Sequence, residues 1–118
     1  MKEGVLIVDG QAVARARKAG NAIERARGLL GRSAPPAGSG LLIEPCAGIH
    51  TWAMAYPIDA VFVDERGEVL RVAAHLPPWR FARCPGARAV FECAAGEARR
   101  LGLRAGARVE WKENVSEK

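Results

Sequence analysis

The sequence lacks the features that mark several common kinds of protein. No apolar run approaches the ~18 residues that a membrane-spanning helix needs, so we expect no membrane span. The three cysteines are odd in number and include no CxxC pair, which argues against a standard structural zinc site. GxSxG, HExxH and glycine-rich phosphate-binding motifs are also missing. These absences do not favour an enzyme, and we expect no cofactor.

The N-terminal segment also lacks the marks of a signal peptide. Residues 1–10, MKEGVLIVDG, contain a lysine and a short apolar run, without a full apolar region or a cleavage site of small residues. This pattern predicts a strand. A cytoplasmic protein is therefore expected, with export as the alternative.

The charge is positive but dispersed. The chain of 118 residues has a formal net charge of +5, which favours acidic or phosphate-bearing partners by long-range attraction. The arginines are interleaved with glutamates, and no basic run is mixed with aromatic residues as in single-strand-binding proteins. We therefore expect a solvated basic surface and no binding of nucleic acid.

Local patterns predict many strands and few helices. Residues 4–17 read as a hairpin around Asp9-Gly10, and residues 58–74 read as a second hairpin with Gly67 in its loop. Residues 20–32 change to helical spacing, with Asn21 as the capping residue. Further strands are expected over 41–45, 49–54, 87–94 and 108–113, a short helix over 95–103, and irregular structure over 75–86.

The order of these elements predicts the fold class. The strands mostly follow one another directly, with turn signals between them, which is typical of antiparallel β folds. We expect a mainly β protein, a compact antiparallel sandwich or barrel of about seven short strands with two short helices. A single-domain monomer is expected over residues 1–118, with 113–118 as a frayed tail.

Two stretches of strand pattern carry unexpected polar groups. In a strand over 49–54, His50, Trp52 and Met54 would share one face. The strand 58–63 is apolar on both faces, so we expect it to be central and covered on both sides. Asp59 at its start needs partners, because unpaired polar burial costs roughly 2–7 kcal/mol. It would cap the Tyr56-Pro57 turn, pair with an arginine, or join His50 and Trp52 at a pocket mouth.

Other polar residues extend this candidate site. Trp79 and Arg80 lie in a proline-rich loop, where the indole would either pin the loop to the core or offer a stacking platform beside a cation. Glu92 is expected to be half-buried and paired with Arg32 or Arg80. The candidate ligand-binding residues are His50, Trp52, Asp59, Trp79, Arg80, Arg32 and Glu92.

The cysteines suggest a weaker alternative. Cys46 and Cys84 both lie beside prolines at the ends of predicted loops, where they could form a bond or join His50 in a metal or redox site. Cys93 alternates with Phe91 on one face of its strand and is expected to be buried.

Several short motifs occur together in a fixed order. They are Gly28-Leu29-Leu30-Gly31-Arg32, Trp52-x-Met54, Pro57-Ile58-Asp59 with Phe62 and Asp64-x-x-Gly67, and Glu92-x-x-x-Gly96. From about Glu24 to Trp111 the chain resembles the domain-of-unknown-function 192 family. The resemblance implies a compact, mostly β fold in which a helix carries the Gly-Leu-Leu-Gly-Arg segment, and it implies no assigned activity.

Three functions remain open from the sequence. The first is a non-catalytic β domain that binds a small ligand or a protein partner in a cleft near His50, Trp52, Asp59 and Trp79. The second is a small enzyme that uses His50 as a base, supported by Asp59 or Cys46. The third is an accessory protein that docks onto a larger assembly.

Overall fold

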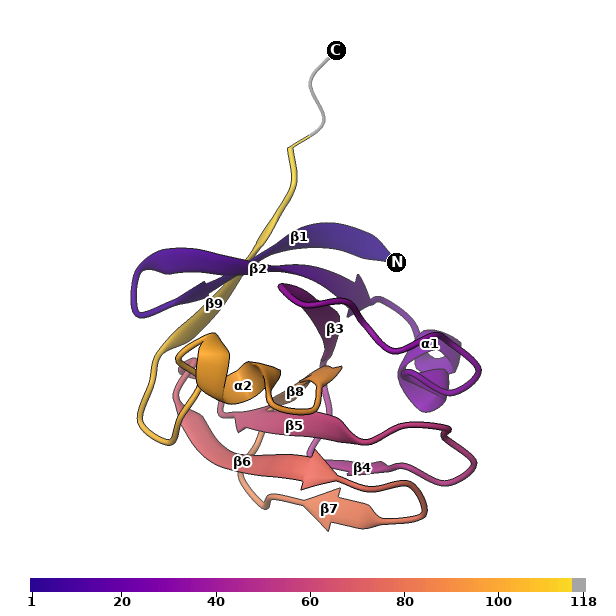
Figure 1. Cartoon of the computed structure of the whole chain (residues 1–118). Helices are drawn as coiled ribbons and strands as arrows, with labels where there is room; N and C mark the ends of the chain where they lie inside the picture. The colour runs from indigo at the N-terminus through magenta and orange to yellow at the C-terminus, as the bar shows by residue number, and fades with distance from the viewer. Residues whose placement is uncertain (116–118) are drawn as a thin grey trace.

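The computed structural model describes residues 1–115 and has a mainly β architecture, as predicted (Figure 1). This part of the chain forms nine strands and two short helices. The strands are β1 (Lys2–Val8), β2 (Gln11–Ala19), β3 (Ser39–Ile43), β4 (Gly48–His50), β5 (Ile58–Val63), β6 (Val69–Leu76), β7 (Phe81–Arg83), β8 (Ala89–Ala94) and β9 (Val109–Glu113). The helices are α1 (Ala22–Arg27) and α2 (Glu97–Arg100). The stretch predicted to be irregular, 75–86, contains β7 and the end of β6.

Seven of the strands form one curled sheet in the order β6-β5-β8-β3-β2-β1-β9, and β4 pairs with β7 in a separate ribbon. The two edge strands of the sheet meet only near their starts, where Glu68 bridges to Arg108. There the N–H of Val69 also donates to the carbonyl of Ala107 at 2.9 Å. The sheet is therefore not closed into a barrel.

One strand pair departs from the expected antiparallel order. β2 and β3 run parallel, whereas the other strand pairs of residues 1–115 are antiparallel. A parallel pair needs a connection of about a dozen residues or more. Residues 20–38, which include α1, provide that length and place α1 beside the sheet (Figure 1).

Both predicted hairpins are present. In the β1–β2 turn, Asp9 and Gly10 have φ angles of 49° and 86°, as a type I′ turn requires. In the β5–β6 turn, Oδ1 of Asp64 accepts from the N–H groups of Arg66 and Glu68, both at 2.9 Å, and Gly67 has a φ of 89°. The two turns fix the registers of their strand pairs.

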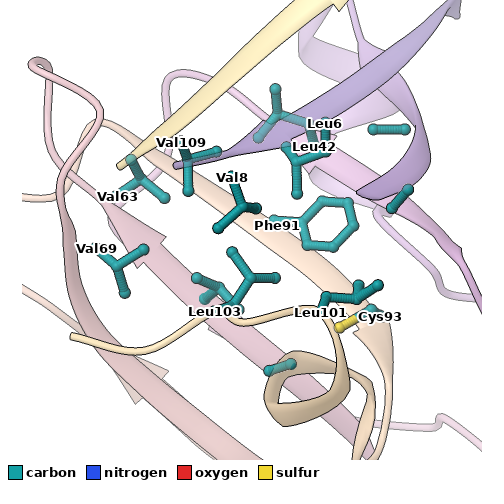
Figure 2. Packing of buried hydrophobic residues seen from close by; sticks show 14 of the residues in the cluster. Leu6, Val8, Leu42, Val63, Val69, Phe91, Cys93, Leu101, Leu103 and Val109 are labelled. Atoms are coloured by element: carbon teal, nitrogen blue, oxygen red, sulfur yellow. The ribbon is translucent and has the colours of Figure 1, made fainter. Parts of the chain in front are cut away.

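The central strands β3, β5 and β8 are buried on both faces, as predicted for residues 58–63. One face packs in a cluster inside the curl of the sheet, with α2 covering it (Figure 2). The other face packs in a second cluster between the sheet, the β4–β7 ribbon and the segment after α1. Phe91 and Cys93 of β8 point into the first cluster, and Val90 points into the second. The buried position of Cys93 is thus confirmed.

Helix α1 is shorter than the predicted segment. The N–H of Glu24 donates to Oδ1 of Asn21 at 2.9 Å, so the predicted cap is confirmed. The helix ends at Gly28, whose φ of 52° suits glycine. The Gly-Leu-Leu-Gly-Arg segment, 28–32, therefore follows the helix as a series of turns and is not carried on it. Ile23 is 81% exposed, so the apolar residues spaced along α1 do not form a buried face of the helix.

The strand predicted over 49–54 ends at His50, which corrects the expected shared face. Thr51 is fully buried, and its hydroxyl donates to the carbonyl of Pro77 at 2.6 Å and accepts from the N–H of Arg80 at 2.9 Å. Ala53 has a φ of 62°. These features turn the chain, so that Trp52 and Met54 lie in turns and not on a strand face.

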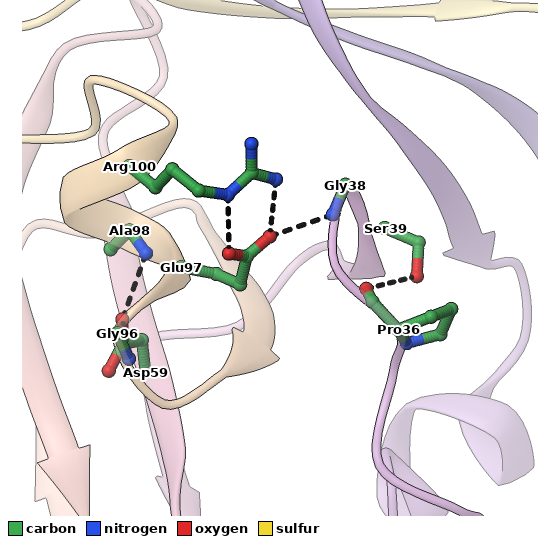
Figure 3. Close-up of polar contacts among 8 residues, drawn as sticks. All are labelled: Pro36, Gly38, Ser39, Asp59, Gly96, Glu97, Ala98 and Arg100. Atoms are coloured by element: carbon green, nitrogen blue, oxygen red, sulfur yellow. Dashed lines mark hydrogen bonds and ion pairs between the residues drawn. The ribbon is translucent and has the colours of Figure 1, made fainter.

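Asp59 ties three segments of the fold together, and Figure 3 shows its side chain beside Gly96 and Ala98 at the start of α2. Its Oδ1 accepts from the N–H of His75 at 2.8 Å, and its Oδ2 accepts from the N–H groups of Gly96 and Ala98 at 3.0 and 2.9 Å. The carboxylate therefore accepts hydrogen bonds from backbone N–H groups, which was one of the predicted alternatives. These groups lie at the end of β6 and at the start of α2. The Tyr56-Pro57 turn and an arginine were the wrong partners.

Glu97 holds α2 to the loop before β3 (Figure 3). Its Oε1 accepts from the N–H of Gly38 at 2.7 Å, and both carboxylate oxygens bind the guanidinium of Arg100 at 2.7 Å. These bonds, the arginine contact first, lower the pKa of Glu97 to about 2.

The ordered C-terminal region extends past residue 113, where the frayed tail was expected to begin. β9 extends to Glu113, and the N–H of Asn114 donates to the carbonyl of Glu3 at 2.9 Å. The remainder of the predicted tail, 116–118, lies outside the described residues. Over residues 1–115, no helix has the length and apolar character needed to cross a membrane.

We expect Asp59→Asn to lower the free energy of unfolding by roughly 2–4 kcal/mol, because an amide nitrogen would face buried N–H donors. Urea denaturation measures the loss. Asp64→Asn is the matched control, since its hydrogen bonds lie in an exposed turn, and it should cost less than about 1 kcal/mol. Equal losses in the two variants would contradict this account of Asp59.

Candidate functional site

A cleft of about 300 Å³ lies where the end of α1 and the start of β4 meet the face of the central sheet. Its apolar walls include Leu29, Ile43, Ile49 and Met54. Its polar groups are Arg25, Arg27, Cys46, His50, Trp52 and Glu92. The cleft lies over the second hydrophobic cluster, on the side of the sheet opposite to Asp59.

Glu92 forms the floor of this cleft. It lies on the central strand β8 between β3 and β5, and is 3% exposed. Its Oε1 atom is buried and has no hydrogen-bond partner among residues 1–115. Burial raises the pKa of this carboxyl to about 7. A carboxyl with such a pKa is populated in both its protonated and its ionised form at neutral pH.

The predicted environment of Glu92 was wrong. The side chain is buried and not half-buried, and it takes part in none of the ion pairs within residues 1–115. Arg32 and Arg80 do not line the cleft. A glutamate is rarely buried without a paired charge, and for this reason a half-buried position with an arginine partner was expected.

Gly28 allows the chain to pass close to this carboxyl. A Cβ atom at Gly28 would lie 3.2 Å from Oε1 of Glu92, within the range where a neighbour must shift. The positive φ of Gly28 also disfavours a side chain there. The glycine that ends α1 is thus the residue that brings the cleft wall against Glu92.

His50 and Trp52 form an aromatic rim. Their ring centroids lie 4.9 Å apart with an interplanar angle of 31°, and the backbone N–H of Trp52 donates to Nδ1 of His50 at 3.3 Å. Trp52 is 53% exposed. A large part of the indole is therefore accessible beside the cleft.

Arg25 and Arg27, in the last turn of α1, supply positive charge to the cleft. Neither residue belongs to an ion pair within the described part of the chain. Nε of Arg27 donates to the carbonyl of Leu30 at 2.9 Å, which orients the guanidinium. Burial raises the pKa of the Cys46 thiol, while the charge of Arg25 acts in the opposite direction.

The structure brings together three of the predicted site residues, His50, Trp52 and Glu92. Asp59 lies beside a separate hollow with His75 and Gly96. Arg32 lines a neighbouring hollow with Arg15 and Arg17. These placements separate Asp59 and Arg32 from the cleft.

Trp79 and Arg80 also lie outside the cleft. Their loop is joined to Thr51 by backbone hydrogen bonds, and the Trp79 side chain is 65% exposed. Trp79 therefore does not pin its loop to the core.

Sequence reasoning missed Arg25, Arg27 and Gly28 as cleft residues. The sequence did contain a signal for them. Gly28 directly follows the helical pattern that ends with Arg25 and Arg27, and a glycine there lets the backbone pass close to another segment, with the two arginines beside it. Glu92, the residue that Gly28 lies against, is distant in the sequence. Its position opposite Gly28 follows only from the pairing of β8 with β3 and β5.

The cysteines do not form the suggested site. Cys46, Cys84 and Cys93 are all free thiols, so the proposed Cys46–Cys84 bond is not present. Across residues 1–115, no three His, Cys, Asp or Glu side chains gather closely enough to hold a metal ion. The suggested grouping of Cys46, His50 and Cys84 is therefore not assembled.

We expect a thiol reagent such as DTNB to modify Cys46 and Cys84 in the native protein and to leave Cys93 unmodified. Burial raises the pKa of Cys93 to about 12, so its thiolate is scarce as well as inaccessible. Peptide mass spectrometry reads the modified sites, and protein unfolded in urea provides the reference. Native modification of Cys93 at the unfolded rate, or a two-hydrogen mass deficit, would contradict the described state.

We expect Glu92 to make stability fall as pH rises. Its folded-state pKa of about 7 lies above the unfolded value of 4.5, so the folded state binds more protons between these two pH values. The stabilising difference is present below about pH 4.5 and is lost as pH rises through about 7. Relative to Glu92→Gln, the wild-type free energy of unfolding should fall by up to about 3 kcal/mol between pH 4.5 and 8.

Urea titrations of both proteins across this pH range measure the difference. A difference between wild type and Glu92→Gln that stays constant with pH would show that Glu92 titrates normally.

A family model identifies the family of the chain, and two solved structures share its fold. The model of the DUF192 family, described as "Uncharacterized ACR", matches residues 5–111. A crystal structure of a Novosphingobium aromaticivorans protein of unknown function is 28% identical, with a TM-score of 0.79, and the match covers 92% of this chain and 84% of that chain.

A second crystal structure, of a Sinorhizobium meliloti protein described as a candidate transcription regulator, has a TM-score of 0.80. It is 21% identical over 94% of each chain, a level that shows the fold alone. Among curated proteins, none matches significantly. Since the family model spans most of the sequence and the fold agrees, the chain belongs to the DUF192 family.

Proposed function

We propose that the protein binds a small organic molecule in the cleft over Glu92 and does not convert it chemically. The observation that carries the proposal is that Glu92 lines the cleft while its buried Oε1 atom has no hydrogen-bond partner among residues 1–115. A hydrogen-bond donor on a molecule in the cleft would give this carboxyl the partner that residues 1–115 do not provide.

The energetic cost of Glu92 supports a functional role. An unpartnered buried polar group destabilises a protein by roughly 2–7 kcal/mol, depending on the reference state. An apolar residue at the same place would extend the second hydrophobic cluster, of which Ile43 and Ile49 line the cleft with Glu92. Strongly shifted carboxyls in clefts are typical of functional sites.

The size and lining of the cleft fit a small molecule. A volume of about 300 Å³ corresponds to roughly ten water molecules, at ~30 Å³ for each water in the liquid, which is enough for a small organic molecule. Ligand sites are typically concave and mostly apolar, with a few polar groups that fix orientation. Leu29, Ile43, Ile49 and Met54 provide the apolar walls here, and Glu92 provides a fixed polar group.

The arrangement supports binding more than catalysis. A histidine base needs a group that orients it, and both oxygens of Asp59 are occupied by backbone N–H groups at another site. Cys46 lines the cleft with His50, but burial raises the pKa of its thiol, which makes it a weak nucleophile. The residues of the cleft are suited to holding a molecule.

A ligand screen with matched variants tests the proposal. The probes are D-glucose, D-glucuronate, L-arginine, putrescine, adenosine monophosphate and benzoate, each added at pH 7 to isotope-labelled protein and followed by NMR. At least one probe should shift the signals of Glu92, Gly28 and Trp52. Glu92→Gln should weaken that binding tenfold or more, since the amide replaces one acceptor oxygen by a donor.

Glu97→Gln is the control variant, because Glu97 is also a buried glutamate but contacts Gly38 and Arg100 away from the cleft. It should bind the probe as the wild type does. No shift with any probe, or equal binding by Glu92→Gln and wild type, would overturn the proposal.

A further inference from the structure

We infer that the molecule bound in the cleft is a sugar acid of monosaccharide size, with ring hydroxyls held by Glu92, a ring face against Trp52 and a carboxylate held by Arg25 and Arg27. This inference rests on the proposed function. It depends on three kinds of group that line the same cleft, each suited to a different part of such a ligand.

Glu92 is suited to hydroxyl groups. A hydroxyl both donates and accepts hydrogen bonds, so it can pair with a carboxyl in either protonation state. Glu92 is present in both states near neutral pH, because burial raises its pKa to about 7. A cationic ligand would pair only with the ionised form, and it would enter past Arg25 and Arg27. Glu92 is the sole carboxylate among the described residues that line the cleft, so a neutral hydroxyl is favoured over a cation.

Trp52 and His50 supply a flat apolar surface at the rim. The indole is 53% exposed, and its ring stacks near the imidazole at 4.9 Å, which limits its movement. Aromatic rings bury a large apolar area and pack against the flat C–H faces of ligands. A pyranose ring has such a face together with hydroxyls at its edge, so it can contact the indole and the Glu92 carboxyl at once.

Arg25 and Arg27 supply the charge for an acidic group. A guanidinium binds a carboxylate through two parallel hydrogen bonds. Nε of Arg27 is used by the carbonyl of Leu30, which leaves its terminal nitrogens for a ligand. The carboxylate of a sugar acid whose ring contacts Trp52 and Glu92 would lie where α1 places these arginines.

Calorimetry with three probes separates the parts of the ligand. D-glucuronate has the ring, the hydroxyls and the acid, whereas D-glucose lacks the acid and cyclohexanecarboxylate lacks the hydroxyls. D-glucuronate should bind at least tenfold more tightly than either of the others. A short galacturonate oligomer, compared with D-galacturonate, then distinguishes the source, because tighter binding of the oligomer indicates the end of an acidic glycan and tighter binding of D-galacturonate indicates a free sugar acid.

Variants assign each contact. Trp52→Ala should weaken D-glucuronate binding about tenfold, and the double variant Arg25→Ala/Arg27→Ala should reduce the affinity to that for D-glucose. Trp79→Ala is the matched control for the indole, since Trp79 is 65% exposed but lies outside the cleft. Arg99→Ala, on α2, is the control for charge. Both controls should bind as the wild type does.

The outcomes distinguish this inference from the proposed function. Binding of putrescine or benzoate over Glu92, without binding of D-glucuronate, would overturn the sugar acid and leave the proposed function standing. Equal affinities for the three calorimetry probes, or equal weakening by Trp79→Ala and Trp52→Ala, would also overturn it. Failure of every probe to bind would overturn both.

Discussion

The burial of β3, β5 and β8 on both faces is the constraint on which the structure depends. Alternate residues of these strands pack into two separate clusters, so each strand must carry apolar side chains on both of its faces. Asp59 and Glu92 are the exceptions on these strands, and they face opposite clusters. Asp59 has three backbone donors, whereas Oε1 of Glu92 has no partner within residues 1–115. The same burial therefore gives one carboxyl a structural role and leaves the other available.

The elements around Glu92 explain how a cleft is kept on this face. The crossover from β2 to β3 carries α1 to the sheet, and Gly28 ends the helix beside the carboxyl. The β4–β7 ribbon covers the remainder of the face, and buried Thr51 turns the chain so that Trp52 lies at the rim. Cations, an aromatic pair and an acid thus meet at one place from segments that are distant in the sequence.

Local patterns predicted much of the fold but little of the site. The hairpins at Asp9-Gly10 and Gly67, the Asn21 cap and the central position of 58–63 follow from residues close together in the chain. The parallel β2–β3 pair and the end of β4 at His50 depend on long-range contacts, such as that of Thr51 with Pro77. His50, Trp52 and Glu92 were identified as site residues, but Arg25, Arg27 and Gly28 were not, because strand order decides which side chains meet.

The pKa of the Glu92 carboxyl decides whether this side chain is buried without a partner. Carbon-13 NMR of the side-chain carboxyl, assigned by its disappearance in Glu92→Gln, follows its protonation as pH changes. Burial of the carboxyl should give a midpoint near about 7, and added D-glucuronate should change that midpoint. A midpoint near the ordinary value of 4.5 would show a solvated or paired carboxylate and would contradict the account.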